Sequence, residues 1–350
     1  MPSFTYADVG IDLTKIKGIH TLLASELRKT FRSREGKFGS VISEIGHYAG
    51  LVDIGGGKAL ALHVDGVGTK VLIAQMMNKF DTVGIDCVAM CVNDLICVGA
   101  EPFALIDYIA LERADDRLVY ELTLGLVKGA EEASVAIVGG ETAVMPDVIK
   151  GVNGRGFDLA AMCCGILEKD RVVTGKELRE GDVVLGVKSS GIHSNGLSLA
   201  RKVLLGRYRV EDYLDELGRS LGEELLEPTY IYVKPTLKAL KECEIHGMAH
   251  ITGGAFSKLQ RLVRGSGLGF NLDNMPKPPT IFSLIQREGK ITEREMFRTF
   301  NMGIGFCICA PSKDVDSISN IYEREGFSVE RIGKVDRVDG VFVKGIRVDD

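Results

Sequence analysis

Apolar residues recur along the chain with two different periods, and each period predicts a type of secondary structure. Between residues 16 and 27 they return every three or four positions, which predicts a helix with one apolar face. Residues 59–65 (ALALHVD) are a short, largely apolar run that ends at a glycine-rich corner, the pattern of a strand. Helical spacing returns in residues 86–99, where polar Asn93 and Asp94 interrupt the apolar pattern. This part of the chain therefore mixes helices with strands.

Residues 102–167 also combine predicted strands with a predicted helix. We expect a strand at 102–112, an amphipathic helix at 115–133, a strand leading into a glycine corner at 134–146 and a buried strand at 157–167. The order strand, helix, strand, strand, helix, strand predicts an α+β domain built on a mixed sheet.

A change of composition marks a domain boundary. Residues 168–182 (EKDRVVTGKELREGD) are charged and rich in turn formers, and a new strand and helix are predicted directly after them. We therefore expect two domains, residues 1–168 and residues 169–350, close to the size of about 150 residues that is common for a domain.

Composition and charge limit the partners. The chain is 45% hydrophobic and 26% charged, which is ordinary for a soluble globular protein. Its 43 Lys and Arg residues and 48 Asp and Glu residues give a net charge of −5, and no long basic run occurs, so we expect no nucleic-acid partner. Local amides, lysines or a metal ion would have to hold an anionic ligand.

Neither a targeting signal nor a membrane segment is predicted. The polar N-terminus lacks an apolar signal core, and no apolar run approaches the length of about 20 residues that spans a bilayer, so we expect a cytoplasmic protein without membrane contact. The eight cysteines include no Cys-x-x-Cys pair and lie mostly in apolar segments, which favours buried thiols over disulfides or zinc.

The motif DGVGTK (residues 65–70) carries the first candidate chemistry. The predicted strand would bring Asp65 to the end of a sheet, Gly66 and Gly68 allow close backbone approach, and Thr69 and Lys70 would lie at the start of the next helix. Backbone amides at such a corner can bind phosphate, and carboxylates can hold a divalent cation. The motif therefore predicts a nucleotide-phosphate and magnesium site.

Further acidic residues extend this prediction. Asn93 and Asp94 need polar partners inside an apolar helix, and a metal-bound nucleotide would supply them. Asp107 lies in the following strand, and Glu141 follows a pair of glycines after another strand. Taken singly, Asp65 and Asp94 could cap turns or pair with a lysine, and Glu141 could cap a helix. The combination of these polar residues favours a nucleotide and magnesium site over the single structural roles.

Three later corners predict a second half-site. SSGIHSNG (residues 189–196) places hydroxyls, an amide and glycines at a strand-to-helix junction, which suits an oxyanion or phosphate, although Ser and Asn also serve as helix caps. HITGGAF (250–256) and RTFNMGIG (298–305) have similar polar and glycine-rich forms and are expected to face it. His250 is a candidate general base or phosphate donor, or else a structural histidine.

Several common enzyme signatures are absent from the sequence. It contains no G-x-x-x-x-G-K-[ST], no G-x-G-x-x-G after a strand, no H-E-x-x-H and no G-x-S-x-G. A P-loop NTPase, a Rossmann dehydrogenase, a zincin and an α/β-hydrolase therefore lose their usual motifs.

Taken in order, the motifs identify a family. YADVGID, DGVGTK, GID-VAMCVNDL, GAEP, IDY, VGGETA-MP, SSG-HSNG, H-TGG and TFN-G-G together resemble those of phosphoribosylformylglycinamidine cyclo-ligase, the aminoimidazole ribonucleotide synthetase of purine biosynthesis. The resemblance runs from about residue 6 to the last strands. It implies a fold of two α+β domains and a homodimer in which the N-terminal mixed sheets join into a barrel.

The resemblance also implies a reaction with two cofactors, ATP and Mg²⁺. The formamide oxygen of formylglycinamidine ribonucleotide would attack the γ-phosphorus of ATP to give an imidoyl phosphate. The ring-forming nitrogen would then attack the same carbon, and phosphate would leave with formation of aminoimidazole ribonucleotide. Because ring closure is intramolecular, positioning and charge neutralisation would be the main tasks of the enzyme.

Roles carried over from the resemblance fall on the same motifs. Asp94, Lys70 and His250 are the candidate catalytic residues. The candidate nucleotide-binding residues are Asp65, Gly66, Gly68, Thr69, Lys70, Asn93, Asp94, Gly99, Ala100, Pro102 and Glu141. The candidate metal ligands are Asp65, Asp94, Asp107 and Glu141. The candidate substrate-binding residues are Ser190, Gly191, His193, Ser194, Asn195, Thr252, Gly253, Gly254 and Asn301.

The chain departs from the family pattern in two places, and related proteins offer alternative functions. Ala255 stands where the family usually has a third glycine, and the loop at residues 34–40 is less glycine-rich than expected.

Selenophosphate synthetase and thiamine-monophosphate kinase share the architecture, but the first would carry a reactive Cys near its N-terminus, whereas the first cysteine here is Cys87. A non-catalytic nucleotide-binding scaffold is the third alternative, and retention of both half-sites argues against it.

Overall fold

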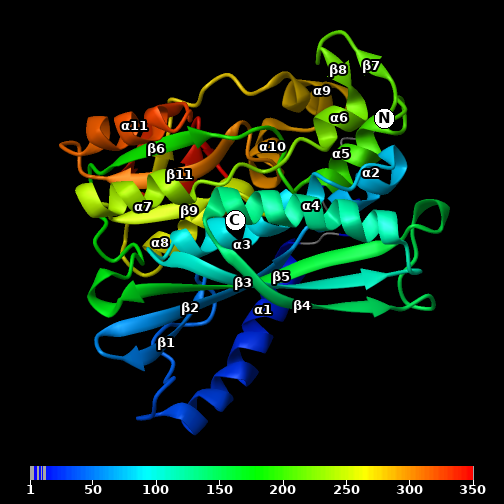
Figure 1. Ribbon diagram of the computed structural model, residues 1–350. Helices are drawn as coiled ribbons and strands as arrows, with labels where there is room; N and C mark the ends of the chain where they lie inside the picture. Colours follow the sequence, from blue (N-terminus) through cyan, green and yellow to red (C-terminus); the bar gives the residue numbers. More distant parts are fainter. Residues whose placement is uncertain (1–3, 6–7, 9, 11–12, 350) are drawn as a thin grey trace.

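Two mixed sheets and the helices around them make up the part of the chain that the computed structural model describes, residues 4–5, 8, 10 and 13–349. The five-stranded sheet has the order β1-β2-β5-β3-β4 (Figure 1). The seven-stranded sheet has the order β14-β13-β10-β12-β6-β11-β9. A short hairpin, β7-β8, forms a third sheet. The predicted α+β fold with mixed sheets is confirmed, since β3 and β4 pair in parallel while β2, β5 and β3 pair antiparallel.

The first sheet and its helices come from the N-terminal half of the chain. Its strands are β1 (Gly50–Gly55), β2 (Lys58–Gly66), β3 (Glu101–Leu111), β4 (Ala136–Val144) and β5 (Phe157–Glu168). The associated helices are α1 (Leu13–Leu27), η2 (Arg28–Arg34), α2 (Lys70–Met77), α3 (Val83–Ile96), α4 (Asp116–Ala133), η3 (Val152–Gly154) and η4 (Lys169–Arg171).

The remaining elements come from the C-terminal half. The strands are β6 (Val183–Lys188), β7 (Tyr213–Leu214), β8 (Arg219–Ser220), β9 (Gly247–His250), β10 (Gly269–Leu272), β11 (Ile304–Ala310), β12 (Val329–Asp336), β13 (Val341–Val343) and β14 (Ile346–Arg347). The helices are α5 (Leu197–Leu204), α6 (Leu221–Leu225), α7 (Val233–Glu242), η5 (Ala255–Leu259), α8 (Gln260–Val263), α9 (Thr280–Gly289), α10 (Glu293–Thr299) and α11 (Val315–Arg324).

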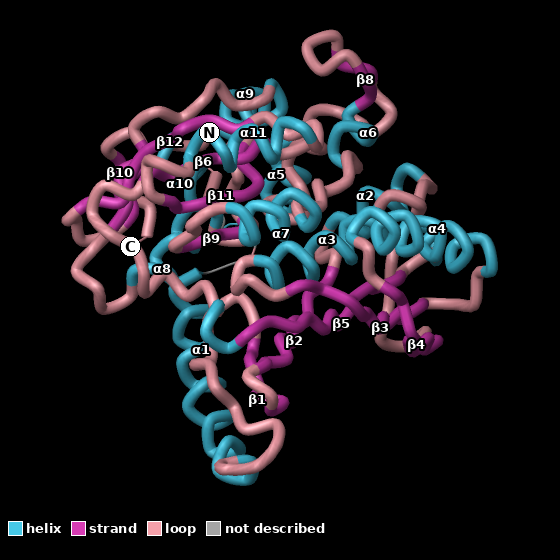
Figure 2. The backbone as a smooth tube through the Cα atoms, turned by 60° about the vertical axis from the view of Figure 1, so that its left-hand side comes forward, coloured by secondary structure: helices cyan, strands magenta, loops and turns pink. Residues whose placement is uncertain are grey.

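Helix α3 is the central element of the molecule. All of its residues are buried, because it lies on the five-stranded sheet with α4 beside it and contacts β9 and α7 from the other half of the chain (Figures 1 and 2). Two glycines let α3 and α4 approach closely: a Cβ at Gly84 would lie 2.3 Å from the backbone nitrogen of Leu126, and one at Gly125 would lie 2.3 Å from the carbonyl oxygen of Asp81. The polar residues of α3 are therefore held rigidly between the two sheets.

The outer face of the five-stranded sheet is not covered by helices. Val64 on β2 and Ile106 on β3 both pair with Met162 on β5, so their side chains point to the same face, and they are 67% and 40% exposed. Tyr108, two residues further along β3, points the same way and is exposed. An apolar sheet face therefore lies open in the single chain.

Two elements differ from expectation. Residues 134–146 do not turn at their glycines, because β4 continues through Gly140, so the expected glycine corner was wrong. The glycine is needed for space instead: a Cβ at Gly140 would lie 2.4 Å from the Asp107 carboxylate on the neighbouring strand. Helix α1 forms as predicted but extends away from both sheets (Figure 2), and its apolar Leu22 and Leu27 are exposed.

No helix in the described ranges is both long and apolar enough to cross a bilayer.

Candidate active site

Asp65 lies at the end of β2, as the motif predicted, and faces α3. Its carboxylate accepts a hydrogen bond from the backbone amide of Gly66 at 2.8 Å. Burial raises the pKa of Asp65, and the nearby charge of Asp94 raises it further. Negative charge from two neighbouring carboxylates therefore gathers at this end of the sheet, where a further cation would be stabilised.

Asp94 is the polar centre of the interface between the two halves of the chain. Its carboxylate accepts a hydrogen bond from Nδ1 of His250 on β9 at 2.8 Å, and Nε2 of His63 on β2 lies 3.5 Å away. Burial alone would raise the pKa of Asp94, but the charge of Lys258 and the hydrogen bond from His250 hold it well below its ordinary value. Asp94 is thus a buried carboxylate that stays ionised.

His250 is fully buried at the end of β9. Burial lowers its pKa, and the bond to Asp94 only partly offsets this effect. A neutral imidazole whose Nδ1 donates to Asp94 presents a proton-accepting Nε2. That nitrogen lies 3.5 Å from Nδ2 of Asn93, in the space between the two halves of the chain.

Asn93 is used in a structural link. Its Nδ2 donates to the carbonyl of Tyr230 at 2.8 Å and its Oδ1 accepts from the amide of Tyr232 at 3.0 Å. The side chain therefore fixes the loop before α7 onto α3. It was predicted to bind nucleotide, and these two bonds use both ends of its amide.

Lys70 forms a buried ion pair with Asp86. Its Nζ lies 2.8 Å from Oδ2 of Asp86 and donates to the carbonyl oxygen of Glu227 at 2.6 Å. Asp86 also accepts from the amide and hydroxyl of Thr229 at 2.8 and 2.6 Å and from the hydroxyl of Ser194 at 3.1 Å. The positive charge of Lys70, which was predicted to face phosphate, is thus balanced by Asp86 inside the protein. We call this group of four residues the buried clamp: Lys70, Asp86, Ser194 and Thr229.

The rest of the DGVGTK corner is more open. Gly68 has a φ of +68° and is exposed, as is Thr69, whose hydroxyl lies 3.0 Å from that of Ser198. Arg201 on α5 donates to the carbonyl oxygen of Thr69 at 3.2 Å. The corner therefore lies against the start of α5, beside the SSGIHSNG motif.

The SSGIHSNG motif forms a tightly bonded loop before α5. Ser190 donates from its hydroxyl to the carbonyl of Pro228 at 2.5 Å and from its amide to Nε2 of His193 at 3.2 Å. His193 is fully buried with a φ of +64°, and burial lowers its pKa well below the usual range. A non-glycine residue in this backbone region is strained, a feature that is frequent at functional sites.

The two later corners meet this loop in different ways. A Cβ at Gly253 would lie 2.7 Å from the side-chain oxygen of Asn195, so the HITGGAF corner faces the loop directly. Asn301 instead holds the loop together: its amide donates to the carbonyls of Gly191 and Ile192, and its oxygen accepts from the amide of Gly303. Asn301 was predicted to bind substrate, and in the structure these hydrogen bonds stabilise the SSGIHSNG loop.

Backbone strain recurs in the two later corners. Ala255, which replaces the family's third glycine, has a φ of +43°, and Met302 has a φ of +50°. Each adopts a conformation that L-residues with a Cβ avoid. The surrounding packing therefore imposes the shape of these corners, because both residues are buried.

The GAEP turn packs against the protein itself. Gly99 has a φ of +84°, and a Cβ there would lie 3.2 Å from the carbonyl oxygen of Arg171. Ala100 is fully buried. Pro102 lines a cavity of about 310 Å³ between the start of β3, the end of α4 and the helix α7. The turn thus lies at the far end of α3 from Asp86.

The other two predicted acids lie on opposite faces of the sheet. Asp107 and Asp65 both pair with Ala161 on β5, so they flank it on the face toward α3, with α-carbons roughly 9.5 Å apart across two strand spacings. Glu141 pairs with Tyr108 instead and is exposed on the outer face. Within one chain the fold brings Asp65, Asp94 and Asp107 to the α3 side and keeps Glu141 away from them.

The acids on the α3 side offer a partial metal site. Within the ranges that the structure describes, no group of three or more His, Cys, Asp or Glu residues is arranged to hold a metal ion. Carboxylate oxygens are nonetheless the ligands that Mg²⁺ prefers, and this ion commonly binds through one or two carboxylates plus phosphate oxygens and water. The residues therefore fit a magnesium ion that arrives with a nucleotide, and they do not form a complete protein cage.

Three polar residues of this region were missed in the sequence. His63 precedes Asp65 by two positions on a strand, so alternation alone places both on one face, and this signal was available. Asp86 lies in the first turn of a wholly buried helix, and only the fold reveals its partner Lys70. Lys258 donates to the hydroxyl of Thr252 at 2.5 Å, a contact that its sequence pattern did not indicate.

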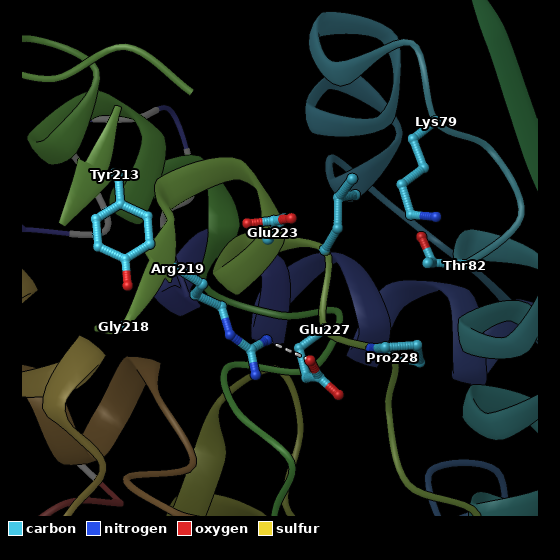
Figure 3. Close-up of a pocket in the computed structure, with 9 residues that line it drawn as sticks. Lys79, Thr82, Tyr213, Gly218, Arg219, Glu223, Glu227 and Pro228 are labelled. Carbon is cyan, nitrogen blue, oxygen red and sulfur yellow. Dashed lines mark hydrogen bonds and ion pairs between the residues drawn. The ribbon is translucent and has the colours of Figure 1, made fainter. Parts of the chain in front are cut away.

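A larger cavity lies outside this cluster. It has a volume of about 440 Å³ and is lined by Lys79, Tyr213, Arg219, Glu227 and other residues near the β7-β8 hairpin (Figure 3). Arg219 is bonded to Glu227 at 2.5 Å and Lys79 to Asp81 at 2.9 Å, so these cations are already paired. Glu227, which lines the cavity, accepts a hydrogen bond from Lys70 of the buried clamp through its backbone carbonyl.

Comparison with known proteins identifies the family. The model of the N-terminal domain of AIR synthase related proteins matches residues 46–167, and the C-terminal model matches residues 179–346. A phosphoribosylformylglycinamidine cyclo-ligase of Pyrococcus furiosus is 50% identical over 344 residues, which cover 98% of each chain. One of Methanocaldococcus jannaschii is 46% identical over 98% of this chain and 95% of its own. The chain belongs to the phosphoribosylformylglycinamidine cyclo-ligase family. It is therefore a ligase, as the motifs predicted.

Solved structures of more distant proteins share the fold. AaThiL complexed with AMPPCP and TMP aligns with a TM-score of 0.66 at 19% identity, covering 97% of both chains. Thiamine-monophosphate kinase from Stenotrophomonas maltophilia gives 0.64 at 18% identity over 91% of this chain and 96% of its own. At these identities the similarity concerns the fold alone, and it confirms the predicted two-domain architecture.

Proposed function

We propose that this enzyme closes the imidazole ring of aminoimidazole ribonucleotide by phosphorylating the formamide oxygen of formylglycinamidine ribonucleotide with ATP. The link from Asp94 to His250 carries the proposal. It joins Asp94 on α3, one of the acids on the nucleotide side, to β9, which leads into the HITGGAF corner. A reaction that transfers a phosphoryl group from one ligand to another needs two half-sites that meet in this way.

The nucleotide half-site is proposed at the end of β2. The exposed Gly68 and Thr69 of the glycine corner would offer their backbone amides to phosphate oxygens. Asp65, with Asp107 on the same side of the sheet, would hold the magnesium ion that accompanies ATP. Bound there, magnesium would neutralise phosphate charge and stabilise the developing charge on the leaving ADP. The raised pKa of Asp65, which follows from burial and from Asp94, supports a cation at this position.

The substrate half-site is proposed between the SSGIHSNG loop and the HITGGAF corner. Asn195 and Gly253 already lie face to face there, and strained backbone at His193 and Ala255 shapes both walls. His250, neutral because burial lowers its pKa, would accept a proton from the ring-forming nitrogen through Nε2. Asp94 would hold that imidazole in the required tautomer.

Turnover tests this assignment directly. The enzyme, ATP and magnesium are incubated with and without formylglycinamidine ribonucleotide while phosphate and aminoimidazole ribonucleotide are both followed. We expect the two products to appear together, one for one, and only when the substrate is present. Phosphate release without the aminoimidazole product would contradict the proposal.

A homodimer is the proposed functional form. The open outer face of the five-stranded sheet carries Val64, Ile106 and Tyr108, and a second copy of the same face would bury them. Substituting Ile106→Lys should shift the sedimentation coefficient to that of a monomer. Tyr120→Lys, at an exposed position of α4, is the matched control and should leave the dimer intact. An unchanged dimer in the Ile106→Lys variant would contradict the proposed interface.

A further inference from the structure

Lys258 lies where the two proposed half-sites meet. It belongs to η5, directly after the HITGGAF corner, and its ammonium donates to the hydroxyl of Thr252 at 2.5 Å. A lysine ammonium has three protons to donate, and this is the one hydrogen bond that the described residues provide for it. Two protons of the group are therefore free for a ligand.

The charge of Lys258 acts on the nucleotide side as well. Apart from burial, Lys258 is the strongest influence on the pKa of Asp94, and its charge also lowers the pKa of Asp65. One ammonium thus lies within electrostatic reach of the acids at the end of β2 and α3 while bonded to the substrate-side hydroxyl of Thr252.

An aromatic ring fixes the ammonium in position. Nζ of Lys258 lies 5.9 Å from the centre of the Tyr48 ring, and the guanidinium carbon of Arg261 lies 5.0 Å from the same centre. Both are cation–π distances. Tyr48 is 1% exposed, and its hydroxyl has no hydrogen-bond partner in the described part of the chain. Two cations gathered on one buried ring, beside an unpaired hydroxyl, favour an anion that binds between them.

The phosphoryl group needs such a cation, because the expected one is already used. Lys70 was predicted to face phosphate, but it is fully buried and paired with Asp86. A phosphoryl group in transfer carries negative charge on its equatorial oxygens, and catalysis of this step depends on positioned positive charge. Lys258 is the partly exposed lysine of the cluster.

We propose that Lys258 is a further catalytic residue, which contacts the phosphoryl group as it passes from ATP to the formamide oxygen, and that Tyr48 and Arg261 position it. The inference rests on the proposed function above. In the step concerned, a lone pair of the formamide oxygen forms a bond to the γ-phosphorus. The bond from that phosphorus to the bridging oxygen breaks, and its electron pair leaves with ADP. The ammonium keeps its proton throughout and supplies charge only.

The expected effect is on turnover more than on nucleotide binding. Loss of one preorganised electrostatic donor typically costs about 100- to 1,000-fold in kcat. We therefore expect Lys258→Met to lower kcat by about that factor while the affinity for the non-hydrolysable analogue AMPPCP with magnesium changes only a few-fold. Lys258→Arg keeps the charge and should recover part of the turnover. Lys128→Met, at an exposed position of α4, is the control and should behave as the unmodified enzyme.

Four measurements on the full-length enzyme and these three variants test the inference: kcat, the KM for ATP, the affinity for AMPPCP and the midpoint of urea unfolding. Support requires a large loss of kcat in Lys258→Met with nearly unchanged AMPPCP affinity and unfolding midpoint, and partial rescue in Lys258→Arg. Equal losses of kcat and AMPPCP affinity, a lowered unfolding midpoint, or normal turnover in Lys258→Met would overturn it. Failure of the unmodified enzyme to form product would instead contradict the proposed function, and this inference with it.

Discussion

The substitution Lys70→Met separates a structural role of this lysine from the phosphate-binding role that its sequence motif predicted. In the structure Lys70 and Asp86 are both fully buried, with Nζ 2.8 Å from Oδ2. Methionine has similar length and no charge, so it fills the space and leaves the Asp86 carboxylate buried without its cation.

The magnitude follows from burial and from the number of partners. Removing one member of a buried ion pair typically costs about 3–5 kcal/mol, because the remaining charge is left uncompensated. Replacing both members with apolar residues is often nearly neutral. Here the double variant Lys70→Met with Asp86→Leu would also strand the buried amide of Thr229, at about 1–3 kcal/mol. The two substitutions together should therefore cost less than the sum of their separate costs.

Urea unfolding followed by circular dichroism, at one fixed protein concentration, measures these differences. If the free energy of unfolding falls by about 3 kcal/mol per molar urea, Lys70→Met should lower the unfolding midpoint by roughly 1 M or more. The double variant should recover part of that loss. If Lys70→Met kept the normal midpoint but lost affinity for AMPPCP, the buried clamp would be dispensable and the reasoning from the structure would be refuted.

Three further predictions concern other parts of the fold. Gly125→Ala should destabilise the protein by about 1–3 kcal/mol in the same unfolding assay, because its Cβ would lie 2.3 Å from the carbonyl oxygen of Asp81; a normal midpoint would contradict the close α3–α4 contact. His246 is hydrogen-bonded to Asp182 at 2.7 Å and Glu244 at 2.9 Å; burial lowers its pKa, but these bonds outweigh burial and raise it. The protonated His246 contributes fully to stability below its unfolded pKa of about 6.5, and this contribution is lost as pH rises through the folded pKa. His246→Gln should therefore be more destabilising at about pH 5.5 than at about pH 9. An equal loss of stability at both pH values would refute this prediction. Asp94→Asn should abolish turnover while the protein stays folded, with an unchanged sedimentation coefficient, and near-normal activity would remove Asp94 from the site.

Local patterns in the sequence predicted most of the elements that position the site. The strand ending at Asp65 and the helix carrying Asp94 formed where the two hydrophobic periods placed them. His63 belonged to the same strand pattern, since it lies two positions before Asp65. Motif order predicted the family and hence the two-domain fold, both of which the comparisons confirm.

What the sequence did not reveal depends on contacts between distant residues. The role of Lys70 depends on Asp86, Ser194 and Thr229, which come from both halves of the chain. The place of Glu141 depends on an irregular register between β3 and β4, which sets it opposite Tyr108 on the outer face. The glycine pair before it suggested a turn, but the structure requires a glycine there to make room for the Asp107 side chain on the next strand.

The fate of the formamide oxygen tests the account most directly. The substrate is prepared with a heavy oxygen isotope in its formyl group and turned over with ATP and magnesium, and the released phosphate is analysed by mass spectrometry against the amount of aminoimidazole ribonucleotide formed. We predict one phosphate per product, each carrying the label, since the oxygen leaves bound to phosphorus. Unlabelled phosphate, or phosphate in excess of product, would contradict the proposed chemistry of this site.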